Sequence, residues 1–102
     1  MRRLVVIAFL SLGVLASVAV AQRGERPSCI GVETEARFSG YAFRHTVTIE
    51  NRCARTAVCT VSTDVNPQEQ RVEVPRGETR DVITHSGSPA SVFEAHVDCE
   101  LR

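Results

Sequence analysis

One segment indicates the fold of this chain most clearly: Tyr41-Ala42-Phe43-Arg44-His45-Thr46-Val47-Thr48-Ile49-Glu50-Asn51. Its odd positions up to Ile49 carry aromatic, imidazole or aliphatic side chains, and its even positions from Arg44 onward are polar or charged. A period of two sends alternate side chains to opposite faces of a β-strand. The stretch therefore predicts a half-buried strand whose odd-numbered side chains point toward a core.

The same alternation recurs on both sides of this strand. It covers residues 30–38, 57–62, 72–74 and 93–101, and a further short strand is predicted over 79–84. Turn-forming residues separate these segments, and Gly87 to Ser91 is predicted to be a loop. After residue 21 no stretch has a sustained apolar period of 3.6 residues. We therefore predict an all-β antiparallel sandwich of about six strands, with one buried and one solvated face on each sheet.

The N-terminus has the three parts of a secretory signal peptide. Met1-Arg2-Arg3 is positively charged, Leu4 to Val20 is almost wholly apolar, and Ala19-Val20-Ala21 supplies the small residues that signal peptidase requires. A retained membrane anchor is the alternative, but an apolar run of about 17 residues is at the short limit for crossing a bilayer. We predict a signal-peptide helix over 1–21, a flexible lead-in over 22–28 and one β-sandwich domain over 29–102.

The cysteines predict that this small domain is held by disulfides. A domain of this size is marginal on hydrophobic burial alone, so covalent links are expected. Four cysteines follow the predicted cleavage site, namely Cys29, Cys53, Cys59 and Cys99. An even number in an exported chain is typical of disulfides. Their spacing of 23, 5 and 39 intervening residues fits no zinc module.

The strand faces favour one of the three disulfide connectivities. Cys59 and Cys99 both fall on apolar faces, so both should point into the core. If Ser39-Gly40 closes a two-residue hairpin, Cys29 lies opposite Glu50 and close to Cys53. We therefore prefer Cys29–Cys53 with Cys59–Cys99. The alternative is a local Cys53–Cys59 loop with Cys29–Cys99 joining the ends.

The charge pattern excludes two classes of partner. The chain carries 12 basic and 12 acidic residues, and removal of Arg2 and Arg3 with the signal peptide leaves a slight negative excess. No basic stripe is present for nucleic acid, and no polybasic patch for a membrane surface. We expect neither nucleic acid nor membrane as a partner of the mature domain.

The titratable residues suggest no catalytic, cofactor or metal site. His45 should lie on the inner face of its strand and bond to backbone, while His85-Ser86 is a sequence neighbour pair rather than a triad. A weak cation patch is conceivable on the outer face of the last strand, although a solvated face is the simpler interpretation. That patch would comprise Glu94, His96, Asp98 and Glu100. We therefore predict a protein that is not an enzyme and has no cofactor.

The aromatic residues are few, and most are predicted to be core residues. Tyr41, Phe43 and Phe93 fall on inward faces of the predicted strands, and the chain has no tryptophan. Sequence alone therefore shows no aromatic set for recognising carbohydrate or protein.

Two pairs of segments resemble known proteins. Thr46 to Asn51, followed by Val72 to Thr79, resembles bacterial immunoglobulin-like domains of the cell-adhesion-related kind, which carry a V-x-V-x-N strand end and a later P-x-G-E-[ST] hairpin. Phe43 to Val47 and Cys59 to Pro67 are similar to a group of small exported bacterial proteins of unknown function. The first resemblance implies an immunoglobulin-like sandwich, and neither implies a substrate or a catalytic residue.

These observations together predict an exported, periplasmic or extracellular protein. We expect a non-enzymatic binding or structural module of the cell envelope, whose partner is another envelope or extracellular protein. A small secreted inhibitor or effector is the alternative, since small size and disulfides fit that class as well.

Overall fold

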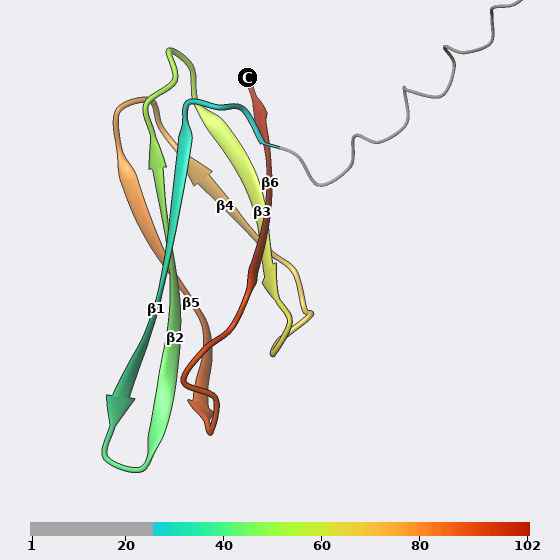
Figure 1. Ribbon diagram of the computed structural model, residues 1–102. Coiled ribbons are helices and arrows are strands. Elements are labelled where there is room, and N and C mark those ends of the chain that lie inside the picture. Colours follow the sequence, from blue (N-terminus) through green and yellow to red (C-terminus); the bar gives the residue numbers. More distant parts are fainter. Residues whose placement is uncertain (1–25) are drawn as a thin grey trace, which may run out of the picture.

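A computed structural model describes residues 26–102, which form an all-β domain (Figure 1). The predicted signal peptide and most of the predicted lead-in lie outside the described residues. The strands are β1 (Ile30–Ser39), β2 (Ala42–Asn51), β3 (Ala57–Thr63), β4 (Gln70–Val74), β5 (Thr79–Ser88) and β6 (Ala95–Leu101). The described residues contain no helix long and apolar enough to cross a membrane.

The six strands form two antiparallel sheets of three strands each. One sheet has the order β1-β2-β5 and the other the order β4-β3-β6. Two hairpins, β1–β2 and β3–β4, stay within a sheet, and the other three connections carry the chain from one sheet to the other. Figure 1 shows the sheets as two layers. The predicted all-β, two-sheet architecture is therefore confirmed.

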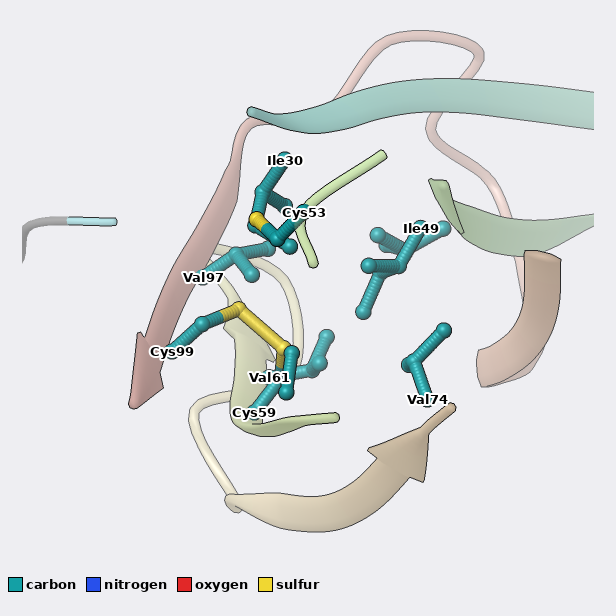
Figure 2. Packing of buried hydrophobic residues seen from close by; sticks show 10 residues of the cluster. Ile30, Ile49, Cys53, Cys59, Val61, Val74, Val97 and Cys99 are labelled. Carbon is teal, nitrogen blue, oxygen red and sulfur yellow. A yellow bond between two sulfur atoms is a disulfide. The ribbon is translucent and has the colours of Figure 1, made fainter. Parts of the chain in front are cut away.

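The core lies between the two sheets and contains the side chains that alternation places inward (Figure 2). On β2 Val47 and Ile49 are fully buried, and on β3 Ala57 and Val61 face them from the opposite layer. Burying one such aliphatic side chain stabilises the fold by about 1.5–3 kcal/mol. The period of two in the sequence therefore marks the faces of the central strands correctly.

The turn between β1 and β2 differs from the predicted one. Ser39 and Ala42 are opposite each other, so the two loop residues are Gly40 and Tyr41 rather than Ser39 and Gly40. Gly40 has a φ of +81°, which glycine adopts without strain, and the amide of Tyr41 donates to the carbonyl of Ser39. Tyr41 is therefore 89% exposed, and the prediction that it points inward was wrong.

This register also changes the neighbours of Cys29. The amide of Arg52 donates to the carbonyl of Cys29 over 3.0 Å, so Cys29 lies beside Arg52 rather than Glu50. Cys53 follows directly, and Cys29 and Cys53 form a disulfide with their Cα atoms 5.1 Å apart. The bridge ties the start of β1 to the segment that leaves β2.

The second disulfide joins Cys59 and Cys99, which lie directly opposite each other on β3 and β6. It therefore links neighbouring strands of one sheet (Figure 2), and both cysteines belong to the buried core. The two pairings are those that the strand faces favour, and the described residues contain no free cysteine. Two disulfides indicate that the domain matures in an oxidising compartment.

The last two strands differ from the predicted ones at their ends. β5 continues to Ser88, beyond the predicted end at Thr84, because two register irregularities against β2 let the strand bend and keep pairing. β6 begins at Ala95 rather than at Phe93. The connection between these strands is short and lies over the inner face of β2.

Asn51, the last residue of β2, connects the ends of several segments. Its side-chain amide donates to the carbonyls of Arg55 and Val74, each over 2.9 Å, and its side-chain oxygen accepts from the amide of Cys53 over 2.8 Å. Its backbone carbonyl accepts from the amide of Gly77. This fully buried side chain therefore holds the crossover after β2 against the end of β4.

Candidate functional site

The three histidines of the domain do not converge on one site. His45 is fully buried, its Nε2 lies 2.8 Å from the carbonyl oxygen of Ala90, and its ring stacks on Phe93 with centroids 4.2 Å apart. The ring of His85 is 6.1 Å away, and His96 is exposed on β6, in the other sheet. His45 is therefore a buried side chain bonded to backbone, as its position in the sequence predicts.

The conceivable cation patch on β6 does not assemble. Glu94, His96, Asp98 and Glu100 are all exposed, as predicted for an outward face. Within residues 26–102 no group of three or more histidine, cysteine, aspartate or glutamate side chains could hold a metal ion. The solvated-face interpretation therefore fits the geometry of this strand.

His85 and Ser86 lie next to each other in β5, and the structure does not show them as a hydrogen-bonded pair of nucleophile and base. Ser86 is exposed and His85 is half-buried. No hydrogen bond joins their side chains among those that the described residues make.

Exposed aromatic side chains are grouped at the end of the β1–β2 hairpin, residues 37–44, which we call the hairpin end. It carries Phe38 and Phe43 opposite each other, with ring centroids 5.2 Å apart in an edge-to-face arrangement, and Tyr41 at its turn. Phe38 is 58% exposed and Tyr41 is 89% exposed. In Figure 1 the hairpin end reaches farther than the neighbouring end of the second sheet.

Because these rings are exposed, the small domain does not gain the stabilising free energy that their burial would contribute. The described residues contain four aromatic side chains, and two of them, Phe38 and Tyr41, lie exposed at this end rather than in the core. Single exposed apolar side chains are ordinary, but aromatic rings grouped at one protruding end are typical of contact surfaces. The hairpin end is therefore a candidate binding surface.

The charges at the hairpin end support the same interpretation. Arg37 lies directly opposite Arg44, and like charges at such positions destabilise a hairpin. Arg37 is partly compensated by Glu35, whose carboxylate is 3.0 Å from its guanidinium. Arg44 makes no salt bridge with any residue that the structure describes. Arg44 lines an open hollow with Glu35 and Asp81 but forms a salt bridge with neither, so its guanidinium offers a fork of donors to an acidic group of another molecule.

A shallow open hollow of about 190 Å³ lies beside these side chains. Tyr41, Phe43 and Arg44 line it from the hairpin, and Ser86 and Gly87 line it from β5. A larger open hollow of about 500 Å³ lies at the other end of the outer face of the same sheet. In this larger hollow Arg52 forms a salt bridge with Glu50 over 2.7 Å. The arginine of the smaller hollow, Arg44, forms none with the described residues.

Sequence reasoning missed the hairpin end because it placed Tyr41 and Phe43 together on an inward face. The signal that could have revealed it is the segment Arg37-Phe38-Ser39-Gly40-Tyr41-Ala42-Phe43-Arg44, where aromatic and arginine residues flank a glycine turn on both sides. Comparison with protein-family models, with curated proteins and with solved structures found no match for this chain.

Proposed function

We propose that this protein is a non-enzymatic exported binding module whose hairpin end contacts another protein of the cell envelope or the extracellular space. The observation that carries the proposal is the grouping of exposed Phe38 and Tyr41 with Arg44, which has no ionic partner within residues 26–102. Aromatic and arginine side chains are enriched at the energetic centres of protein interfaces. The partner surface that fits is an apolar patch next to one or more carboxylates.

We also propose that the sandwich is of the immunoglobulin-like kind. In that fold the first, second and fifth strands share a sheet, and the third pairs with the sixth in the opposite sheet. The placement of β1, β2 and β5 in one sheet and of β3 beside β6 in the other supports this assignment. β4 departs from the constant-type arrangement, because it pairs with β3 rather than with β5. Domains of this architecture commonly bind other proteins through their loops and hairpins, although the fold alone does not assign a function.

Export is supported by the two disulfides and by the N-terminal sequence pattern. Mass spectrometry of the protein from its native cells tests it directly. We expect a mature N-terminus at Gln22 and a mass four hydrogens below that of the fully reduced form. Retention of Met1 to Ala21, or free thiols in the exported protein, would contradict the export proposal.

Site-specific photo-crosslinking in the native cell envelope tests the contact surface. With p-benzoylphenylalanine at position 41, we expect one discrete protein adduct, because this ring position is exposed at the proposed contact. The matched control places the same group at Arg76, which is exposed in the turn between β4 and β5, at the opposite end of β2 from the hairpin end. Arg44→Glu in the crosslinking protein should reduce the adduct, since it replaces the arginine that would face the partner's carboxylate.

Adducts of equal yield at positions 41 and 76, or no adduct at either, would count against the hairpin end as the contact surface. An adduct with an enzyme that the purified domain inhibits would instead identify the secreted inhibitor or effector alternative. Substrate turnover by the domain itself, lost on changing His45 or His85, would contradict the non-enzymatic part of the proposal.

A further inference from the structure

We propose that the mature protein forms a homodimer in which the β1 strands of two copies pair antiparallel, edge to edge, about a two-fold axis at Ala36. The inference goes beyond the proposed function. It concerns the backbone edge of β1 and a second copy of this chain. Arg37 and Phe38 belong to both surfaces, whereas Tyr41 and Arg44 belong to the hairpin end alone.

The four sheet edges of the domain differ in how readily another strand could join them. β4 is only five residues long, and β5 has two register irregularities against β2. β6 points the acidic side chains Asp98 and Glu100 outward, so two β6 strands would repel each other. Short strands, bulges and like charges are the devices by which proteins protect sheet edges.

β1 is neither short nor irregular, and its outward side chains Glu33, Glu35 and Arg37 carry charges of both signs. It is ten residues long, it pairs with β2 in an unbroken register, and among the described strands β2 is its sole partner. One side of its backbone therefore presents a row of amide and carbonyl groups suited to a further antiparallel strand.

The outward side chains of β1 are complementary to those of a second copy in one register. When Ala36 lies opposite the second copy's Ala36, Glu35 lies opposite Arg37 and Arg37 lies opposite Glu35. The neighbouring register centred on Arg37 places Arg37 opposite Arg37, and the one centred on Glu35 combines a Glu35–Glu35 contact with two Glu33–Arg37 pairs. Only the Ala36 register of these three has opposite-charge pairs and no like-charge pair. Opposite charges at directly facing positions stabilise strand pairing and like charges destabilise it, so the charges select the Ala36 register.

The side chains needed for these contacts are accessible in one copy. The side chains of Arg37 and Glu35 are 64% and 58% exposed, and their charged atoms lie 3.0 Å apart on one face. In the dimer these two residues and their counterparts would form a cluster of four alternating charges. Such a network is more stabilising than one exposed pair.

The other face of β1 gains apolar contacts in the same register. Phe38, which is 58% exposed, would lie opposite the second copy's Thr34 and diagonal to its Ala36. The small side chain of Ala36 lets the two strands approach at the axis. Both copies would keep their inner faces on the same side, so two three-stranded sheets would become one continuous six-stranded sheet.

Sedimentation equilibrium of the exported, oxidised protein tests the dimer through its charges. We expect the wild-type protein to have twice the mass of one mature chain. Glu35→Arg and Arg37→Glu should each raise the dissociation constant by about tenfold or more, because each replaces two attractive contacts with two repulsive ones. An equimolar mixture of the two variants should form a heterodimer, since one then supplies two arginines and the other two glutamates.

The double variant E35R/R37E should restore the homodimer, because it exchanges the two charges without removing their complementarity. Glu100→Arg on β6 is the matched control, and it should leave the dimer unchanged. Thermal denaturation of every variant checks that each still folds, as expected for exposed side chains.

Three outcomes would overturn the proposal. They are a wild-type protein that stays monomeric, a dimer that Glu35→Arg does not weaken, and two single variants that fail to associate when mixed. Crosslinking at position 41 does not depend on these charges, so failure of the dimer and failure of the proposed function are separate results.

Discussion

Asn51 shows how much of this small domain depends on one polar side chain. It is fully buried and satisfies the amide of Cys53 and the carbonyls of Arg55 and Val74. Asn51→Ala leaves these groups without a partner, and each buried unsatisfied group costs about 1–3 kcal/mol. We expect a loss of about 3 kcal/mol in the free energy of unfolding, measured by urea denaturation.

Asn66→Ala is the matched control for Asn51→Ala. The side chain of Asn66 also bonds backbone groups, the carbonyl of Thr84 and the amide of Gln68, but the residue is only half-buried. Water can replace its hydrogen bonds, so we expect a loss of about 1 kcal/mol. Equal losses for the two variants would show that burial does not set the cost.

His45 tests whether packing or hydrogen bonding holds the connection between β5 and β6. Its ring stacks on Phe93 and bonds the carbonyl of Ala90, while its Nδ1 is buried without a partner. His45→Ala removes the ring and should lower the free energy of unfolding by about 3 kcal/mol. His45→Phe keeps the stack, so its stability should stay within about 1 kcal/mol of the wild-type value. If the two variants lose equally, the bond to Ala90 is the dominant interaction.

At the scale of elements, the turn between β4 and β5 depends on Gly77. The amide of Glu78 donates to the carbonyl of Pro75, and Gly77 has a φ of +77°. A Cβ there would meet nothing within 4 Å, so Gly77→Ala should cost only the backbone strain, about 1 kcal/mol. Gly77→Asn should cost less, because asparagine tolerates this conformation better. Urea denaturation measures both losses.

Gly31→Ala is the control for the turn glycine. Gly31 lies within β1 without a positive φ, and the nearest atom to an added Cβ is the flexible end of Arg52, 3.0 Å away. We expect little change in stability, because the guanidinium can shift into solvent. A loss as large as that of Gly77→Ala would show that backbone conformation is not the cause.

In the β1–β2 hairpin, the sequence predicts the inward positions of β2 correctly but not the position of the turn. The inward positions of β2 could be read from the alternation, because the period of a strand is a local property. The turn was misplaced by one residue, which puts Tyr41 in the loop rather than at the start of the strand. Turn geometry is set by backbone conformation at Gly40, and either position of a two-residue loop can accommodate a glycine.

At the scale of the whole molecule, the two disulfides should contribute unequally. Cys59–Cys99 spans 40 residues and Cys29–Cys53 spans 24, and a longer loop loses more entropy when it is closed in the unfolded chain. Replacing either pair by alanine should cost about 3–4 kcal/mol. C59A/C99A should cost more, since its sulfurs also pack in the core, whereas Cys29 is only half-buried. Urea denaturation of both double variants measures this order, and the reverse order would contradict it.

Residue patterns within the chain predict the faces of the central strands, the two-sheet all-β class and the favoured cysteine pairing. These follow from a period of two and from cysteines that fall on apolar faces or beside a hairpin, all of which are set within one or two neighbouring strands. Which side chains meet across long separations in the chain depends on how the two sheets pack. The Ala90 and Phe93 contacts of His45 and the Val74 contact of Asn51 are of this kind.

The exposure of the hairpin end also became visible only in three dimensions. Whether Phe38 is covered depends on how far the opposite sheet extends, and alternation along one strand carries no information about that. The same holds for the edge of β1, because an edge is defined by the absence of a neighbour in the assembled sheet. Local sequence determines how a strand is patterned, whereas packing of distant segments determines which part of that pattern remains available for binding.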